Sequence, residues 1–505
     1  MASDPDYGMF INGENVSSAS GEVFQLTDPS TGEPFTTVAK GSPDDIDRAV
    51  RIAREAFESG VWSEKSPKER AAIMRAISAK FLERAEQFAL AEVQSSGTTL
   101  RRFLNVDVVL VMDLFLRMAE MLEEFPHKEV LDAIPIPGPS HDFVIREPIG
   151  VCGMITPWNF PLILASWKVA PALAMGNTMV IKPASYTPLS TLLLAEVCTE
   201  AGVPPGVINV VPGPGGVTGE SLVTHPEVDK IAFTGSTVVG RRIMQLAAGT
   251  IKKVTLELGG KSPNIILDDA NLDVAVPGSL FAFLMHNGQV CESGTRLLVP
   301  RGLHNEILER MCTIAKNLKV GSPLDPTSDM GPIVSKSQLE TILSYVDAGK
   351  QEGARLVIGG NQLHPEGYEG GYYMEPTIFT DVKNDMRIAQ EEIFGPVLVV
   401  ITYEDLDDAL RIANDTIYGL AGGVWTQDPE KALYVARKIK AGTVWVNDWH
   451  ILRNDGPFGG YKQSGIGREL GHFGLEEYSE VKRIHTSMVP EREKRALYDR
   501  VLTLR

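Results

Sequence analysis

Apolar and polar residues alternate with a helical period over most of residues 42–126. Ser42-Pro43 and Ser66-Pro67 each place a capping serine and an N1 proline directly before an apolar-periodic run, which is a helix-start signal. Residues 128–150 change to a two-residue alternation that proline and glycine interrupt. That pattern predicts edge strands rather than a layer of the core.

From residue 150 onward, short apolar strands alternate with helices. This order predicts right-handed βαβ units around a parallel sheet, so the expected fold class is α/β. Ligands of such sheets bind beyond the carboxyl ends of the strands, where this chain concentrates polar residues and glycines. The predicted strands are 151–155, 178–181, 207–211, 230–233 and 253–257, and the predicted helices are 160–174, 189–201, 219–224 and 238–248.

A second α/β region spans about residues 260–445, with strand candidates at 297–299, 355–358, 397–402 and 443–446. Within it, a largely apolar stretch at 273–285 is predicted to be helical beyond Pro277. This stretch leads into a polar, glycine-containing turn at 286–294 that holds Cys291. Such loops often carry function, so Cys291 is a candidate nucleophile, although a structural thiol is the alternative.

Composition limits the possible partners and the compartment. The chain has 505 residues, enough for two or three domains, and a net charge of −17 that disfavours nucleic acid and anionic membranes. Neither a signal segment nor an apolar run of membrane-spanning length is visible, so we expect a cytoplasmic protein. The four cysteines form neither a disulfide framework nor a Cys-x-x-Cys metal site, and no metal is expected. They are Cys152, Cys198, Cys291 and Cys312.

Three further positions each allow two interpretations. Glu257 closes an apolar strand, where a carboxylate is either paired structurally or held as a base with a raised pKa. Asn159 either caps a helix or donates its amide to an oxyanion. The segment 235–240 lies between a strand and a helix, so it either binds a pyrophosphate or is simply capped by Ser236. The Gly-x-Gly-x-x-Gly fingerprint follows none of the predicted strands.

Taken together, the motifs of the chain resemble the NAD(P)-dependent aldehyde dehydrogenase superfamily from about residue 8 to 488. The resemblance implies a Rossmann-type cofactor domain (1–127 and 149–257) and a catalytic domain (258–445). It also implies a return segment (446–478) and a small β oligomerisation element with a C-terminal tail (128–148 and 479–505). The matching motifs are 155–161, 182–185, 233–237, 256–261, 288–291, 391–396 and 457–465.

The resemblance also assigns catalytic roles. Cys291 would attack the aldehyde, and its own N–H with the Asn159 amide would hold the oxyanion. Loss of a hydride to the nicotinamide would leave a thioester, and Glu257 would activate the water that hydrolyses it. Lys168 and Glu469 match a proton relay, although an ion pair or a solvated surface would also explain them. Since members that transfer the acyl group to coenzyme A lack this glutamate, Glu257 indicates hydrolysis to the free acid.

By family position, Gly235 and Ser236 would contact the pyrophosphate and Lys182 the adenosine ribose. Glu392 would hold the nicotinamide ribose beside Phe394. The implied cofactor contacts are Thr156, Trp158, Lys182, Ser185, Gly215, Gly235, Ser236, Leu258, Glu392 and Phe394.

Ser185 departs from the family pattern, since members that prefer NAD commonly carry glutamate there. A carboxylate at this position would bind the ribose 2′-OH and repel a 2′-phosphate. Serine removes the repulsion while Lys182 adds positive charge, so we expect NADP to be accepted alongside NAD. The alternative is a neutral substitution in which water fills the gap.

The implied substrate tunnel is apolar and aromatic, with no acidic group to hold an amine, and His450 lies where some relatives carry a carboxylate. Medium-chain aliphatic or aromatic aldehydes are therefore expected rather than amino or betaine aldehydes. The alternatives are an NADP-dependent semialdehyde dehydrogenase, for which Arg453 is the nearby cation, and a non-catalytic relative. The implied tunnel residues are Phe160, Leu164, Trp167, Met285, Trp449, Leu452 and Phe458.

The resemblance further implies a homodimer or homotetramer that assembles through 128–150. The charged tail from Pro490 onward has apolar residues at helical spacing. It is predicted either to dock on a neighbouring subunit or to form a frayed, solvated helix.

Overall fold

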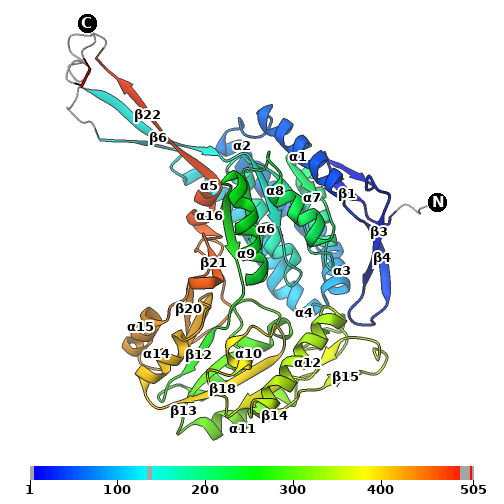
Figure 1. Cartoon of the computed structure of the whole chain (residues 1–505), viewed down its shortest axis with the longest axis vertical. Helices are drawn as coiled ribbons and strands as arrows, with labels where there is room; N and C mark the ends of the chain where they lie inside the picture. The colour runs from blue at the N-terminus through cyan, green and yellow to red at the C-terminus, as the bar shows by residue number, and fades with distance from the viewer. Residues whose placement is uncertain (1–4, 133–138, 490–500, 503–505) are drawn as a thin grey trace.

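The computed structural model describes residues 5–132, 139–489 and 501–502. Its largest sheet has eight strands, of which the central five are parallel, as the βαβ pattern predicted (Figure 1). In spatial order the strands are β2 (Glu14–Val16), β1 (Met9–Ile11), β9 (Ile208–Val210), β8 (Thr178–Lys182), β7 (Val151–Ile155), β10 (Lys230–Thr234), β11 (Lys253–Glu257) and β21 (Gly465–Ile466).

Helices cover both faces of this sheet because successive strand residues point to opposite sides. Val151 packs with α1, α8 and α9, whereas its neighbour Cys152 packs with the larger group around α2, α5, α6 and α7. Capping boxes at Ser42 and Ser66 start α1 and α2, as predicted. The helical segments are α1 (Pro43–Glu58), α2 (Pro67–Glu83), α3 (Ala85–Ser96), α4 (Leu100–Arg102), η1 (Phe103–Asp107), α5 (Val108–Glu124), α6 (Pro161–Ala174), α7 (Leu189–Glu200), η2 (Gly215–Gly219), α8 (Glu220–Thr224), α9 (Thr237–Ala247) and η3 (Ala248–Thr250).

The second sheet has seven strands, all parallel to their neighbours except β14. In spatial order they are β14 (Arg355–Ile358), β17 (Thr377–Thr380), β18 (Val397–Tyr403), β13 (Arg296–Pro300), β12 (Pro263–Ile266), β19 (Ala421–Trp425) and β20 (Thr443–Val446). The helical segments of this region are α10 (Leu272–Leu284), η4 (Met285–Gly288), α11 (His304–Ala315), α12 (Lys336–Gln351), α13 (Arg387–Gln390), α14 (Leu406–Asn414) and α15 (Pro429–Lys438).

Helix α10 begins earlier than predicted. It starts at Leu272 and continues through Pro277, whereas the sequence pattern indicates a helix only beyond that proline. The Asn271 side chain accepts a hydrogen bond from the Asp273 N–H, so a capped first turn forms ahead of the proline.

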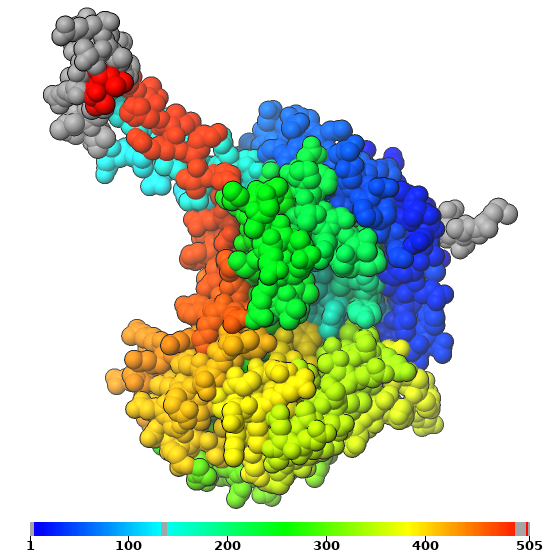
Figure 2. Space-filling view, viewed as in Figure 1, coloured from blue at the N-terminus to red at the C-terminus, as the bar shows by residue number. Residues whose placement is uncertain are grey.

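The remaining elements include a three-stranded antiparallel arm that extends away from the body (Figures 1 and 2). The edge-strand prediction for 128–150 agrees with this arm, but residues 133–138 lie outside the described residues, as does most of the tail after 489. The N-terminal strands were not predicted. These elements are β5 (Lys128–Val130), β6 (Ser140–Pro148) and β22 (Ser479–Ser487) of the arm, the hairpin β3 (Val23–Thr27) and β4 (Pro34–Ala39), β15 (Gln362–Leu363), β16 (Tyr373–Met374), η5 (Lys462–Ser464) and α16 (Gly471–Glu477).

Among the described residues no helix is long and apolar enough to cross a membrane. The cytoplasmic location and the domain boundaries at 258 and 445 stay predictions.

Asn177 joins the base of the arm to the large sheet. Its buried side chain accepts hydrogen bonds from the N–H groups of Ile149 (2.7 Å) and Gly150 (3.1 Å), just before β7. The same amide donates to the carbonyls of Ala172 (3.3 Å) and Tyr478 (2.9 Å), the latter just before β22. One side chain therefore fixes two of the three points where the arm joins the body, the third being the link from α5 to β5.

Replacing this side chain, Asn177→Ala, leaves several buried main-chain groups without partners. We expect a loss of about 1–3 kcal/mol in the free energy of unfolding, measured by urea denaturation. Asn317→Ala, which removes an exposed asparagine from the turn after α11, is the control and should change stability little. Equal stability of the two variants would contradict this role for Asn177.

Candidate active site

The loop that carries Cys291 is fixed by hydrogen bonds from buried amide side chains. The Asn287 amide donates to both carbonyls of the segment 331–332 (3.0 and 2.8 Å), and the Gln289 side chain accepts from the Val334 N–H (3.0 Å). Cys291 follows directly and is partly exposed. The thiol is thus held on a rigid loop between η4 and β13.

Cys291 lines two cavities at once. One is a cleft of about 210 Å³ that contains the amino end of α9, and the other is a narrow, mainly apolar tunnel. The cleft is lined by Pro157, Trp158, Asn159, Thr234, Gly235, Ser236, Glu257, Leu258, Gly259, Cys291, Gln338, Glu392 and Phe394. The tunnel is lined by Val106, Leu110, Phe160, Ile163, Leu164, Trp167, Met285, Cys291, Glu292, His450, Leu452 and Phe458.

The carboxyl group of Glu257 lies buried in the cleft at the end of β11. Neither of its oxygens has a hydrogen-bond partner in the described part of the chain, so the structural pairing considered from the sequence is wrong. Burial, reinforced by the charge of Glu469, raises its pKa well above the usual range. A carboxyl group with a raised pKa is better suited to act as a base that takes up a proton.

Lys168 and Glu469 form a buried ion pair behind Glu257. The Lys168 ammonium also donates to the Thr234 hydroxyl (2.6 Å), and Thr234 lines the cleft. Lys168 lowers the pKa of Glu257 and Glu469 raises it, so the pair acts on that carboxyl through its charges. Neither member of the pair lines the cleft itself. Of the two explanations that the sequence allowed for these residues, the structure shows the ion pair. Their role in a proton relay stays a prediction.

Asn159 does not cap a helix. The N-cap of α6 is Phe160, without a side-chain cap, and the Asn159 amide instead donates to the Gln289 carbonyl at 2.8 Å. This bond directs the amide toward the loop of Cys291, and both residues line the cleft. An amide N–H group beside the thiol is the arrangement that an oxyanion requires.

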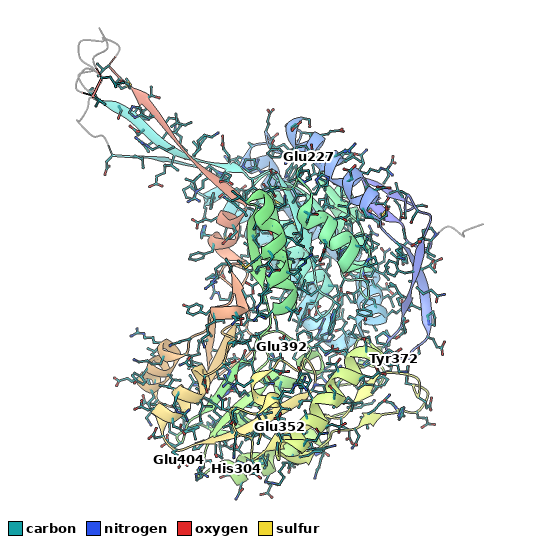
Figure 3. All side chains as sticks on the ribbon, in the orientation of Figure 1. Glu227, His304, Glu352, Tyr372, Glu392 and Glu404 are labelled. Atoms are coloured by element: carbon teal, nitrogen blue, oxygen red, sulfur yellow. The ribbon has the colours of Figure 1, made fainter. Side chains whose placement is uncertain are left out.

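The cleft brings together six of the ten predicted cofactor contacts: Trp158, Gly235, Ser236, Leu258, Glu392 and Phe394. Ser236 caps α9 by accepting from the Val239 N–H (3.4 Å), which leaves the other N–H groups of the first turn facing outward. Glu392 lies between the two halves of the molecule (Figure 3) and accepts from the Gly260 N–H (3.1 Å), while burial raises its pKa to about 7. These residues fit a dinucleotide, with amide donors for phosphate and a carboxyl group for a ribose hydroxyl.

The other four predicted cofactor contacts lie outside this cleft. The Lys182 ammonium (3.2 Å) and the Ser185 hydroxyl (3.0 Å) both donate to the Gly213 carbonyl, and Gly215 opens η2 nearby in the chain. Thr156 is buried just beyond the carboxyl end of β7. Ser185 instead lines a separate cavity of about 250 Å³, whose wall also contains several other hydroxyl side chains and a lysine from the segment 334–337.

Six of the seven predicted tunnel residues line the tunnel: Phe160, Leu164, Trp167, Met285, Leu452 and Phe458. Trp449 does not, so this prediction is wrong. Its ring is fully buried in a separate cluster with Trp445, Ala282 and Ala421. The neighbouring residue, His450, has a left-handed backbone (φ 61°) and takes the place beside the tunnel.

The prediction that the tunnel has no acidic group is also wrong, because Glu292 lines it. The Cys291 thiol donates to Glu292 Oε2 (3.2 Å), and His450 Nδ1 contacts Glu292 Oε1 (3.1 Å). Burial alone would raise the pKa of Glu292, but its bond to His450 and the charge of that ring outweigh burial and lower the pKa below its usual value. Glu292 could have been singled out from the sequence, because it is a charged residue directly after the candidate nucleophile Cys291.

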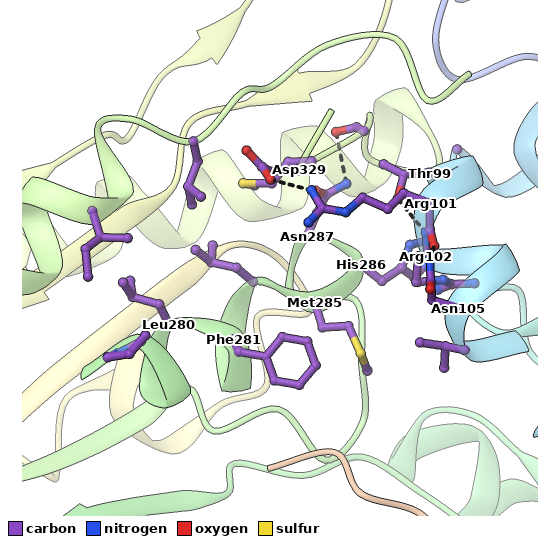
Figure 4. A pocket seen from close by; sticks show the side chains of 18 residues that line it. Thr99, Arg101, Arg102, Asn105, Leu280, Phe281, Met285, His286, Asn287 and Asp329 are labelled. Atoms are coloured by element: carbon purple, nitrogen blue, oxygen red, sulfur yellow. Dashed lines mark hydrogen bonds and ion pairs between the residues drawn. The ribbon is translucent and has the colours of Figure 1, made fainter. Parts of the chain in front are cut away.

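A larger cavity of about 530 Å³ shares Val106 and Met285 with the tunnel (Figure 4). Arg101 and Asp329 form an ion pair on its wall (3.0 Å), and Phe281 and Met285 lie on another side.

Arg453, the cation considered for a semialdehyde carboxylate, lines neither the tunnel nor this larger cavity. Its side chain is exposed and paired with Asp455 (2.7 Å). The structure therefore gives this arginine no contact with a substrate in the tunnel.

Several residues around the site have backbone conformations that favour glycine. Asn287 (φ 57°), Phe394 (φ 59°) and Leu470 (φ 64°) are left-handed although none is glycine. Gly288 combines φ 70° with a position where a Cβ would lie 2.1 Å from the Gly395 carbonyl oxygen. Such positions persist only where the surrounding structure fixes them; Asn287 and Gly288 lie just before the thiol, and Phe394 lines the cleft.

Comparison with known proteins identifies this arrangement. The model of the aldehyde dehydrogenase family matches residues 16–484. The chain belongs to the aldehyde dehydrogenase family. Its activity is therefore that of an aldehyde dehydrogenase, and its fold is the family's α/β fold, as the sequence resemblance implied.

Several relatives of this aldehyde dehydrogenase share nearly its whole length. A betaine aldehyde dehydrogenase of Bacillus subtilis (strain 168) is 44% identical over 482 residues, covering 95% of this chain and 98% of the relative. The structure of a betaine aldehyde dehydrogenase from Staphylococcus aureus in complex with NAD+ is 41% identical, with a TM-score of 0.94 and 96% coverage of both chains. The NAD+ complex of an aldehyde dehydrogenase from Bacillus cereus is 43% identical, with a TM-score of 0.92 and coverage of 96% and 97%.

Proposed function

We propose that this aldehyde dehydrogenase oxidises aldehydes to free carboxylic acids through a covalent intermediate on Cys291, with NAD+ or NADP+ as the oxidant. The observation that carries the proposal is the position of Cys291, which lines both the cleft and the tunnel. A substrate in the tunnel and a dinucleotide in the cleft would meet at its sulfur.

The chemistry follows from the groups that surround the thiol. The Cys291 thiolate attacks the carbonyl carbon, and the Asn159 amide with the Cys291 N–H stabilises the resulting oxyanion. When it is bound, the nicotinamide supplies the oxidising power by accepting a hydride, which leaves a thioester on the sulfur. Covalent attachment thus divides one difficult oxidation into two easier steps.

Glu257 then serves as the base for hydrolysis. Its carboxyl group lines the cleft but not the tunnel, and it has no partner in the described part of the chain that would compete for a water proton. A water molecule that loses its proton to Glu257 attacks the thioester and releases the acid. This water approaches from the cofactor side, because that is where the carboxyl group lies.

Glu257→Gln keeps the shape of this side chain but removes the base. We expect steady-state turnover to fall roughly 10²–10⁴-fold, while one equivalent of reduced nicotinamide still forms in a rapid burst. Stopped-flow measurement of reduced nicotinamide follows both phases. Glu480→Gln on the arm is the control, and Cys291→Ala should lose the burst as well as turnover. A Glu257→Gln enzyme that turns over at the parent rate would refute the assignment.

NAD+ use is supported by the relatives of Staphylococcus aureus and Bacillus cereus, whose structures hold NAD+. Dual use of NADP+ is supported by the surroundings of Ser185. None of the described residues that line its cavity is acidic, and Lys336 lies among them. Lys182 donates to the same Gly213 carbonyl as Ser185, although burial lowers the pKa of this lysine to about 8. A 2′-phosphate there would meet hydroxyl donors and positive charge rather than a carboxylate.

Ser185→Glu introduces the missing carboxylate. Repulsion of the 2′-phosphate should raise the KM for NADP+ about ten-fold or more, with little change for NAD+. Initial rates with each cofactor give both constants. Ser185→Ala, which removes the hydroxyl without adding charge, is the matched control. Equal effects of Ser185→Glu on the two cofactors would mean that residue 185 does not face the phosphate.

For the substrate, the tunnel favours medium-chain aliphatic or aromatic aldehydes. Most of its lining residues are apolar, and both oxygens of the Glu292 carboxylate are taken by Cys291 and His450. A quaternary ammonium aldehyde is the second candidate. It is supported by the 44% identical betaine aldehyde dehydrogenase and by the rings of Trp167 and Phe458, whose centroids lie 5.1 Å apart.

Initial rates with hexanal, benzaldehyde and betaine aldehyde at saturating NAD+ separate these candidates. We expect kcat/KM for hexanal and benzaldehyde to exceed that for betaine aldehyde about ten-fold or more, because a cation would lose its hydration in an apolar tunnel. A higher value for betaine aldehyde would show that the aromatic rings and Glu292 recognise a cation instead.

Assembly into a homodimer or homotetramer through the arm is part of the same proposal. Strand β5 forms one edge of the arm, and its Val130 is exposed, which suits pairing with another subunit.

A further inference from the structure

A chain of contacts leads from the thiol of Cys291 to the main chain of α10. The thiol donates to Glu292 Oε2 (3.2 Å), and Glu292 Oε1 contacts His450 Nδ1 (3.1 Å). His450 Nε2 in turn lies 3.2 Å from the Ala282 carbonyl oxygen. The side chains of Glu292 and His450 are only 4% and 1% exposed, so water screens this chain of contacts little.

The positions of the protons follow from the acceptors. A main-chain carbonyl only accepts, so His450 Nε2 carries a proton. The contact between Nδ1 and Oε1 also needs a proton, held either by the ring or by the carboxyl group. Both ring nitrogens therefore face acceptor oxygens, and an imidazolium beside a carboxylate is the arrangement that satisfies both contacts. The ring of Phe281, whose centroid lies 5.3 Å from that of His450, packs against the imidazole.

We propose that Glu292 holds Cys291 as a protonated thiol in the resting enzyme, and that His450 limits this effect by neutralising the Glu292 charge. Both are positioning residues for the nucleophile, and this role rests on the proposed catalytic function of Cys291. If the thiol lost its proton, the thiolate would lie directly against the Glu292 carboxylate. The imidazolium of His450 contacts the other oxygen of that carboxylate and not the sulfur. The repulsion is therefore short-range and only partly offset.

Two other carboxyl groups that face Cys291 raise the pKa of its thiol, as Glu292 does. Glu257 at the end of β11 and Glu392 after α13 both line the cleft beside the thiol. Burial and the charge of Glu292 raise the pKa of Cys291 well above its usual range. Of these carboxylates, Glu292 accepts the thiol hydrogen bond, so it has the most direct effect.

Two cations act on Glu257 in the cleft. Lys168 and Arg468 both lower the pKa of Glu257, so they act on that carboxyl group rather than directly on the sulfur. The imidazolium of His450 is therefore the positive charge that most directly offsets Glu292.

The test uses alkylation of the full-length enzyme by iodoacetamide, which is uncharged and reacts with the thiolate. The rate at Cys291 is measured against pH by peptide mass spectrometry for the parent, Glu292→Gln and His450→Asn. Glutamine keeps the size of Glu292 without its charge, and asparagine can donate one hydrogen bond without the charge of the imidazolium. Cys312 in α11 is partly exposed and provides an internal reference for folding and reagent access.

The two variants should shift reactivity in opposite directions. Glu292→Gln should lower the pH midpoint of Cys291 alkylation and speed the reaction at neutral pH about ten-fold, which corresponds to a shift of about one pH unit. His450→Asn should raise the midpoint and slow alkylation several-fold, because the carboxylate loses its counter-charge. The double variant should behave like Glu292→Gln, since His450 acts only through Glu292.

A merely structural pair would shift both variants in the same direction or leave both midpoints unchanged, and either result overturns the proposal. If His450→Asn does not fold, the Glu292→Gln variant alone tests the proposal. An unchanged or higher pH midpoint of Cys291 alkylation in that variant overturns the proposal. Alkylation requires neither aldehyde nor cofactor. Failure of this proposal is therefore distinguishable from failure of the proposed function, which the aldehyde turnover of Cys291→Ala tests.

Discussion

Burial of negative charge is the constraint on which this site depends. Four carboxyl groups lie buried or half-buried in or behind the cavities that Cys291 lines, and three of them have hydrogen-bond or ion-pair partners. Glu469 has the ammonium of Lys168, Glu292 has His450, and Glu392 has a main-chain N–H. Glu257 has no partner in the described part of the chain. Because an uncompensated carboxyl group keeps its proton most strongly, its chemistry differs from that of its neighbours.

The two sheets hold these groups at their shared border. Glu257 comes from the last residue of β11, and the loop of Cys291 precedes β13 of the other sheet. Left-handed backbone at Asn287, Phe394 and Leu470 positions side chains from three different segments around this border. Strained conformations of this kind persist only where the surrounding structure fixes them.

The regular parts of the fold were predictable because their signals are local. Strand and helix periods located the parallel sheet, and the serine–proline pairs at Ser42 and Ser66 located two helix starts. The order of the motifs was enough to assign Cys291, Asn159 and Glu257 to one site. The prediction for Trp449 was wrong because it depended on the direction of the side chain, which the spacing of residues alone does not determine. Trp449 and His450 are adjacent, but the left-handed backbone of His450 turns its ring to the tunnel and leaves the tryptophan in a separate cluster.

Glu292 shows the same limit for electrostatics. Its place in the sequence was evident, but its partner is His450, 158 residues away in the chain. The N-terminal strands are too short to give a clear two-residue period. The sequence pattern places the start of α10 after Pro277, whereas the cap at Asn271 starts the helix earlier. For Glu292 and α10, a polar side-chain contact decides what the apolar pattern does not show.

The arm gives the molecule a mechanical property. Strand β6 continues almost directly into β7, and Asn159 follows the far end of β7. At the other junction, Glu469 lies just before α16, and β22 follows α16. Asn177 bonds to both of these junctions. A pull on the arm is thus transmitted along the covalent chain toward Asn159, which lines the cleft, and toward Glu469, which lies behind Glu257. A partner that binds the arm would therefore be connected to the catalytic site through short segments of main chain.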